Sequence, residues 1–160
     1  RRPDVLVYQT AELPEDLSMA GPLQAQFDVS TTETDADFIV KLIDVFPDGN
    51  DPTLLPGYQM MVRSEVLRGR FRNSYEHPEA FEPGKPTTIR LELLDVMHRF
   101  RKGHRIMIQI QSTWFPLVDR NPQTFVPNIY FAKPEDFRRA THRLWRNNQH
   151  PATISFGQVP

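Results

Sequence analysis

The segment His98–Arg105, HRFRKGHR, concentrates side chains that could bind a metal or a nucleic acid. His98 and His104 could offer imidazole nitrogens to zinc, but no acidic third ligand lies between them and the chain has no cysteine. A nucleic-acid surface usually needs a positive excess, whereas this chain has 19 basic and 20 acidic side chains. We therefore interpret both histidines as structural turn residues, and we predict no metal, no cofactor and no nucleic-acid partner.

Nucleophilic catalysis has no motif in this chain. The serines all lack the G-x-S-x-G frame that exposes a nucleophile on a strand–turn–helix elbow. The H-E-x-x-H zinc helix is absent as well. The sequence thus predicts no catalytic residue and no enzymatic activity of the chain on its own.

Asp35 and Asp37 form a D-x-D pattern before an apolar run that ends near Asp44. A calcium loop needs closely alternating oxygen donors and a terminal glutamate, and that pattern is missing. Calcium at a sandwich loop remains the lesser alternative. We expect Asp35 and Asp37 to cap a turn and Asp44 to pair with an arginine.

Arg68, Arg70 and Arg72 alternate with other residues, as expected for an extended segment. They could face a phosphate-bearing ligand, but such a stripe is more often the solvated face of a strand, paired with acids. For the charges of His98–Arg105, the expected partners are loop carboxylates such as Asp119 or Glu92.

Short apolar runs separated by prolines predict an all-β fold. The chain has 15 prolines, and most fall between runs that are continuously apolar or alternate with period two. Lys102-Gly103 is the expected pivot between two such runs, and 134–140 is the expected single helical turn. We predict an antiparallel β-sandwich or jelly roll. Its strands are expected at 4–10, 23–29, 38–45, 59–66, 88–93, 106–110, 141–146 and 152–156.

The loop from Trp114 to Pro122 is unusually rich in large apolar residues and proline. It either caps the end of its own sandwich or forms a contact surface, and composition leaves both readings open. We hypothesise that it docks against another domain, with apolar anchors beside a polar rim. The residues of this suspected domain-interface loop are Trp114, Phe115, Leu117, Asp119 and Arg120.

Four stretches resemble a known family. The run GHRIMIQIQSTWFPLVDRNPQTFVPNIYFAKPEDF (103–137) is similar to the C-terminal region of α-amino acid ester hydrolases, which are relatives of cocaine esterases, glutaryl-cephalosporin acylases and X-Pro dipeptidyl-peptidases. DADFIVKLIDVFPDG (35–49), GYQMMVRSEVLRGRFRNSYEHP (57–78) and HRFRKGHR resemble further parts of the same region. The resemblance covers nearly the whole chain and is greatest to the ester hydrolase branch.

The resemblance implies that residues 1–160 form a single non-catalytic, jelly-roll (galactose-binding-like) domain of a longer serine hydrolase, whose first one or two strands are missing here or come from another segment. The α/β-hydrolase and cap domains of the same enzyme would be its partners, and a homo-oligomer of the full enzyme is compatible with the family. The substrates implied are α-amino acid esters, acyl peptides or β-lactam side-chain amides. The domain would buttress the hydrolase domain and help to wall its active-site cleft.

An independent carbohydrate- or ligand-binding sandwich is the alternative. A lectin-like surface would space its aromatic residues over one exposed face, whereas here they cluster in one loop beside proline. No apolar run approaches the roughly 20 residues that span a bilayer, so we expect no membrane partner. The compartment is not determined by the sequence: the resemblance allows the periplasm or secretion, and the cytoplasm also stays open.

Overall fold

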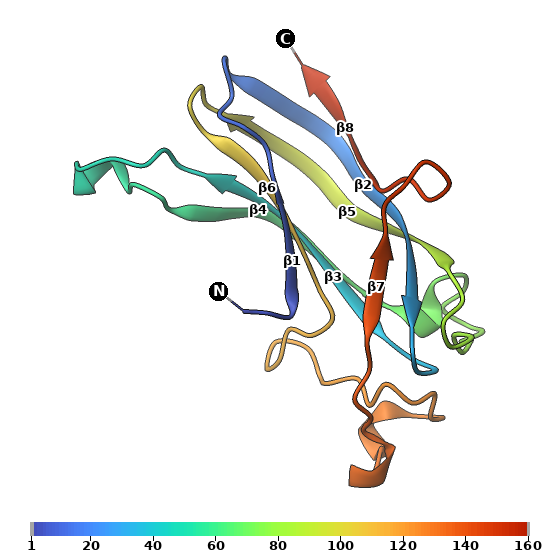
Figure 1. Ribbon diagram of the computed structural model, residues 1–160. Helices are drawn as coiled ribbons and strands as arrows, with labels where there is room; N and C mark the ends of the chain where they lie inside the picture. Colours follow the sequence, from blue (N-terminus) through green and yellow to red (C-terminus); the bar gives the residue numbers. More distant parts are fainter. Residues whose placement is uncertain (1, 160) are drawn as a thin grey trace.

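The computed structural model describes residues 2–159, apart from the side chain of Pro52, and consists of two antiparallel four-stranded sheets (Figure 1). Sheet A has the order β1 (Val5–Gln9), β6 (Arg105–Gln111), β3 (Asp37–Val45), β4 (Gln59–Arg68). Sheet B has β5 (Thr87–Phe100) beside β2 (Leu17–Thr31), and the other edge of β2 pairs with β7 (His142–Trp145) and β8 (Thr153–Val159). The predicted β-sandwich is confirmed.

The core lies between the sheets. Its side chains come from runs in which apolar residues alternate with polar ones and from runs that are continuously apolar. In β2, Leu23, Ala25 and Phe27 are buried and alternate with exposed glutamines, because successive side chains of a strand point to opposite faces. Strand β3 is buried at every position except Lys41, as expected for a continuously apolar run covered on both faces. Phe27 and Phe100 are among the largest fully buried side chains of this core.

Within residues 2–159, four short 3-10 helices interrupt the connections: η1 (Pro52–Leu54), η2 (Gly69–Phe71), η3 (Ile129–Phe131) and η4 (Pro134–Asp136). Helix η4 is the helical turn expected from the sequence. The expectation that residues 68–72 continue in extended form is wrong, because the chain turns into η2 after β4. Gly69 permits this turn, since its N–H donates to the Ala36 carbonyl at 2.8 Å and a Cβ there would lie 2.5 Å from the Phe81 ring.

Residues 101–104 connect β5 to β6, so the prediction of a strand connection around Lys102-Gly103 is confirmed. The connection crosses from sheet B to sheet A, because β5 pairs with β2 whereas β6 pairs with β1 and β3. Gly103 has φ of +83° and donates its N–H to the Leu13 carbonyl at 2.9 Å. A positive φ is the reason for glycine at this position.

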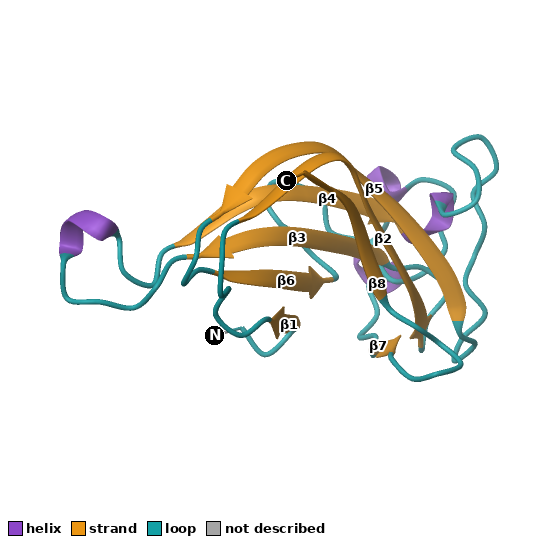
Figure 2. Cartoon of the chain, turned by 90° about the horizontal axis from the view of Figure 1, so that it is seen from above, coloured by secondary structure: helices purple, strands orange, loops and turns teal. Residues whose placement is uncertain are grey.

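The two long sides of the sandwich differ (Figure 2). On one side β4 lies against β5, and Arg63 donates from Nε to the Asp95 carbonyl at 2.7 Å. On the other side β1 and β7 face each other without pairing among the described residues. The pairs β1–β6, β2–β5 and β3–β4 are nested along the chain, as in a hairpin rolled into two layers. This nesting agrees with a jelly roll, which stays the finer prediction.

Candidate functional site

Residues 112–141, which we call the excursion, run between β6 and β7 and lie below the two sheets in Figure 1, in orange. Five large apolar side chains of the excursion are open to solvent: Phe115 (63% exposed), Leu117 (68%), Tyr130 (72%), Phe131 (80%) and, less so, Phe137 (38%). Exposed side chains of this size are typical of contact surfaces when they gather on one segment. The excursion is therefore the candidate site, as an interface rather than a catalytic centre.

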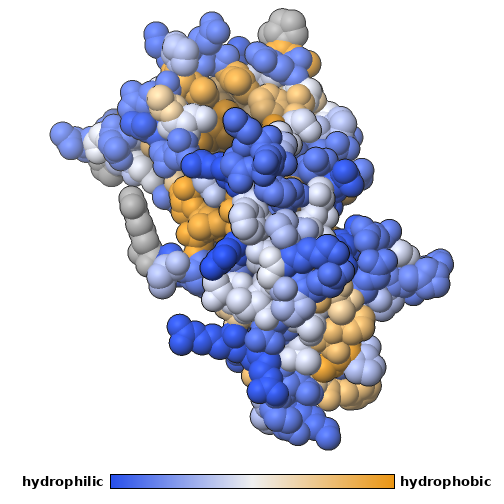
Figure 3. Space-filling view, turned by 45° about the vertical axis from the view of Figure 1, so that its right-hand side comes forward, coloured by the Kyte–Doolittle hydropathy of each residue, from blue (hydrophilic) through white to orange (hydrophobic). Residues whose placement is uncertain are grey.

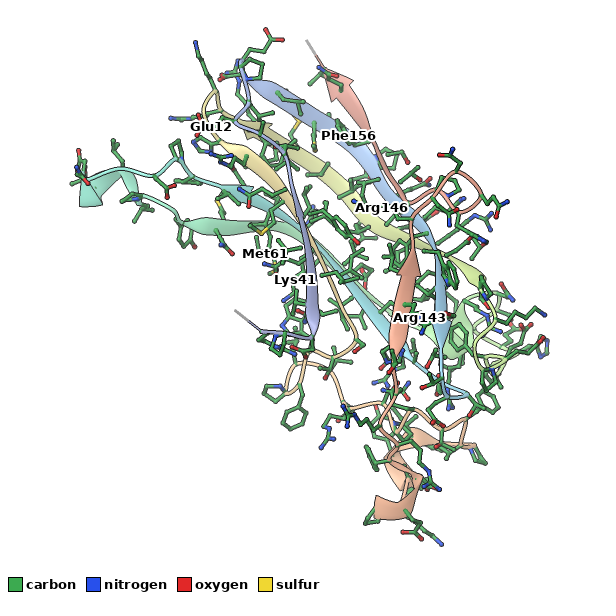
Figure 4. The ribbon with its side chains drawn as sticks, viewed as in Figure 1. Glu12, Lys41, Met61, Arg143, Arg146 and Phe156 are labelled. Carbon is green, nitrogen blue, oxygen red and sulfur yellow. The ribbon has the colours of Figure 1, made fainter. Side chains whose placement is uncertain are left out.

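The base of the predicted loop is fixed to its own domain by Trp114. The Lys41 ammonium lies 3.9 Å from the centroid of the Trp114 ring, a cation–π contact, and Val118 donates its N–H to the Trp114 carbonyl at 3.1 Å. Figure 4 labels Lys41 on sheet A. Trp114 is half-buried, whereas Phe115 stays exposed and does not cap the sandwich. The loop thus presents Phe115 and Leu117 from an ordered base.

A buried ion pair holds the middle of the excursion against the end of the sandwich. Arg70 donates to Asp35 Oδ2 from Nε at 2.9 Å and from Nη2 at 2.6 Å, and its Nη1 donates to the Val126 carbonyl at 2.8 Å. The guanidinium also stacks over the Phe125 ring at 4.6 Å. The expectation that Asp35 caps a turn did not include Arg70 as its partner. Asp35 Oδ1 does accept a hydrogen bond from the Ala36 N–H.

The expected solvated arginine stripe is wrong for Arg70, which is buried. The pairing with acids is as expected: Arg68 lies 3.3 Å from Asp37, and Arg72 lies 3.4 Å from Glu79. Arg70 and Arg68 turn inward because their partners Asp35 and Asp37 are buried, whereas Glu79, the partner of Arg72, is exposed.

Asp37 is the second buried carboxylate at this end, and its Oδ1 accepts from Asn121 Nδ2 at 2.8 Å. Burial raises the pKa of Asp37 to about 6, and the Asn121 hydrogen bond and the Arg68 charge oppose that rise. Asn121 in turn accepts the Gln123 N–H on its side-chain oxygen at 2.7 Å. Asp37 therefore positions the start of the excursion instead of capping an exposed turn.

His98 and His104 meet at a third buried carboxylate. His98 Nε2 lies 2.9 Å from Asp44 Oδ2, and His104 Nδ1 lies 2.7 Å from Asp44 Oδ1. The prediction that Asp44 pairs with an arginine is wrong, because the two histidines on either side of the connection fill both of its oxygens. They are structural side chains, as the sequence indicated.

The guess that Asp119 or Glu92 would neutralise the basic connection is also wrong. Arg99 pairs with Asp16 at 3.1 Å and Arg105 pairs with Glu12 at 2.7 Å, both from the chain that joins β1 to β2. Those acids lie next to the connection because β1 pairs with β6 and β2 pairs with β5.

Between residues 2 and 159, no cluster of three or more histidine or acidic side chains is arranged to hold a metal ion. Over the same residues, no helix has the length and apolar character required to cross a membrane.

Tyr130 and Phe131 were missed at the level of sequence. The sequence feature that could have indicated them is an aromatic pair between Pro127 and Pro134. It lies in the same proline-rich segment as Trp114–Arg120. The structure adds these two side chains to the exposed apolar surface of the excursion.

Fold and site together define an accessory β-sandwich domain, with an apolar contact segment instead of a catalytic constellation in the residues described. A family model for the X-Pro dipeptidyl-peptidase C-terminal non-catalytic domain matches residues 1–155. The chain belongs to this family of non-catalytic C-terminal hydrolase domains.

Relatives with known names agree with this assignment. A cocaine esterase from Rhodococcus sp. (strain MB1 Bresler) is 35% identical over 153 residues, which are 96% of this chain and 25% of the esterase. The crystal structure of an aminopeptidase from a marine sediment Thaumarchaeota archaeon matches at 47% identity and TM-score 0.95, over 99% of this chain and 26% of that one. An α-amino acid ester hydrolase matches at 41% identity and TM-score 0.94, with the same coverage. The chain thus spans about a quarter of these relatives.

Proposed function

We propose that this chain is the C-terminal domain of a serine hydrolase for α-amino acid esters, acyl peptides or β-lactam side-chain amides. In this proposal it buttresses an α/β-hydrolase domain and helps to wall the active-site cleft beneath a cap domain. The α-amino acid ester hydrolase and the cocaine esterase among the relatives support the class of substrate.

The observation that carries the proposal is the excursion, with Phe115 and Leu117 exposed on an ordered base. Apolar anchors held in place before binding lose little conformational entropy on docking, so they suit the centre of an interface. Arg120 and Asp119 are exposed beside them and provide a polar rim. Tyr130 and Phe131 extend the surface in the same segment.

The test is Phe115→Ala, made both in this chain alone and in the longer hydrolase. The isolated chain should keep its free energy of unfolding within about 0.5 kcal/mol, because the ring is exposed. The longer hydrolase should lose activity, and its parts should associate about tenfold more weakly when expressed separately and mixed.

Leu54→Ala is the matched control, since Leu54 is 70% exposed on the distant β3–β4 connection and should change neither property. A loss of roughly 3 to 5 kcal/mol in the isolated chain with Phe115→Ala would mean that the ring supports its own core and does not dock. Suppose that the isolated chain binds a glycan and that the longer hydrolase with Phe115→Ala keeps normal activity. This result would instead favour the alternative of an independent binding module.

A further inference from the structure

A hollow on the excursion is lined by three arginines, and we call it the cup. Its volume is about 460 Å³, and Arg120, Arg138 and Arg139 line it from two separate parts of the excursion. Figure 3 shows hydrophilic surface in blue at the lower end of the molecule, where the excursion lies. Figure 4 labels Arg143 on β7, and the cup adjoins the start of this strand through His142. The fold thus gathers three cations in one hollow.

The charge of the cup is not neutralised within the described residues. None of its three arginines forms an ion pair there, and no aspartate or glutamate lines the hollow. Asp37 contacts the lining through the hydrogen bond from Asn121, but Arg68, 3.3 Å away, is already its counter-charge. The Arg120 guanidinium lies 5.4 Å from the Phe137 ring, which also lines the cup, and this contact holds it at the hollow. A hollow whose charges are all positive attracts anions.

Two buried polar atoms of the lining have no hydrogen-bond partner among the described residues, namely His142 Nδ1 and Gln123 Oε1. Such atoms cost free energy unless a ligand or an ordered water satisfies them. Burial lowers the pKa of His142, so its ring is neutral at physiological pH and can carry its one proton on Nδ1. Gln123 Nε2 donates to the Asn121 carbonyl at 3.2 Å, which leaves Oε1 as an acceptor. The cup therefore offers a neutral donor and an acceptor beside its cations.

These groups together fit a carboxylate that has an amide N–H beside it. A guanidinium forks onto the two oxygens of a carboxylate, so Arg138 and Arg139 suit that end of the ligand. His142 Nδ1 can donate to one of the same oxygens, and Gln123 Oε1 can accept from the amide. A fully ionised phosphate would satisfy the arginines but offers no donor to Gln123. The C-terminus of a peptide and an N-acyl amino acid both have the required arrangement.

We propose that the cup binds the carboxylate end of a substrate of the longer hydrolase, so that this domain helps to determine substrate specificity. The proposal deepens the proposed function and rests on it for the source of the carboxylate, because acyl peptides end in a carboxylate beside an amide N–H. The cup lies on the same excursion as Phe115 and Leu117, the anchors proposed to dock against the hydrolase domain. A carboxylate side chain of that domain is the other source of the same chemistry.

Ligand binding by the 160-residue chain tests the cup directly. N-acetylglycine is the probe, since it has a carboxylate and one amide N–H, and N-acetylglycinamide is its uncharged control. Backbone NMR signals of residues 120–123 and 138–142 should show millimolar binding of the probe and no binding of the control. Arg139→Gln, at an exposed position, should weaken binding at least about fivefold. Arg101→Gln is the matched control, because Arg101 is exposed and lies outside the cup.

Three results of the binding experiment would overturn the proposal. They are no binding of N-acetylglycine, equal binding by the wild type and Arg139→Gln, and binding of inorganic phosphate as tight as that of the probe.

Kinetics of the longer hydrolase distinguish the two sources of the carboxylate. The substrate pair is an acyl peptide with a free C-terminus and the same peptide as its carboxamide. The ratio of kcat/KM for the free acid to that for the carboxamide should fall about tenfold with Arg139→Gln and stay unchanged with Arg101→Gln. An equal loss for both substrates would mean that a carboxylate of the hydrolase domain occupies the cup, and it would overturn the proposal.

Failure of the proposed function would look different. The longer hydrolase would then cleave neither peptide, while the 160-residue chain would still bind N-acetylglycine through Arg139. That result would support the cup as a carboxylate site and overturn its assignment to acyl-peptide substrates.

Discussion

Three buried carboxylates connect segments that are distant along the chain. Asp35 holds Arg70 and through it Val126, Asp37 holds Asn121, and Asp44 holds the two histidines of the β5–β6 connection. A buried charge is stable only when it is paired and hydrogen-bonded, so each contact also fixes the segment that supplies the partner. At the scale of the residue, these three buried carboxylates position the excursion and the β5–β6 connection.

Replacing Asp44 by alanine should destabilise the chain by about 1–3 kcal/mol, because two imidazole groups lose the acceptor that their nitrogens face. Urea unfolding followed by tryptophan fluorescence measures the loss. Asp119→Ala is the control and should stay within about 0.5 kcal/mol, since Asp119 is exposed. Equal stability of the two variants would contradict a structural role for Asp44.

Asp37→Asn should change how stability depends on pH. The pKa of Asp37 is raised in the folded state to about 6 from 3.8, so its stabilising contribution is complete below pH 3.8 and is lost as pH rises through about 6. Asparagine cannot ionise. Relative to the variant, the wild type should therefore lose on the order of 2–3 kcal/mol between pH 4 and pH 7, as measured by urea unfolding across that range.

Asp51→Asn is the control for this measurement. Hydrogen bonds from Thr53 lower the pKa of Asp51 from 3.8, so its stabilising contribution is present above that pH and is lost only as pH falls below it; from pH 4 to pH 7 the difference between wild type and this variant should stay nearly constant. A difference between wild type and Asp37→Asn that is flat from pH 4 to pH 7 would exclude the raised pKa.

At the scale of the element, the β5–β6 connection shows how turn chemistry directs the chain between layers. The chain leaves sheet B at Phe100 and enters sheet A at Arg105, and in between Gly103 adopts φ of +83°. The backbone of residue 103 is also tied to Leu13, so the turn anchors the chain that joins β1 to β2.

Gly103→Val should destabilise the chain by about 1–2 kcal/mol, because a β-branched side chain is strained in the left-handed region. Thermal and urea unfolding measure the effect. Gly49→Val is the matched control: Gly49 is also a loop glycine, but its φ is not positive and an added Cβ meets only Pro56 at 3.9 Å. If both variants unfold at the same denaturant concentration, the conformation of Gly103 is not the reason for its identity.

At the scale of the whole molecule, the sandwich is closed where β4 meets β5 and open where β1 faces β7, while the excursion carries exposed aromatic rings at one end. The open side of the sandwich and the excursion each leave apolar surface in water, and a larger assembly can bury that surface. Both surfaces are therefore candidate contacts for the rest of the longer hydrolase that we propose.

The chain alone should not turn over p-nitrophenyl acetate above the rate of buffer. None of its serines lies in a nucleophile elbow, and Ser112, at the end of β6, is no exception. Spectrophotometric assay at micromolar protein checks this, with Ser112→Ala as the comparison. Turnover that disappears with that variant would show that the chain is itself catalytic.

The sequence by itself determined the sandwich, the strand connection at His98–Arg105 and the resemblance to hydrolase accessory domains. The sandwich and the connection follow from local properties: a period-two pattern fixes which face of a strand is buried, and a Lys-Gly pair between two such runs indicates a turn. The partners of the buried charges were decided only by the tertiary structure. Asp44 meets His98 and His104, and Asp35 meets Arg70, because nested pairing brings together residues 35 to 60 positions apart. Such pairings depend on which strands are neighbours, and neither charge nor hydrophobic period along the chain encodes that order.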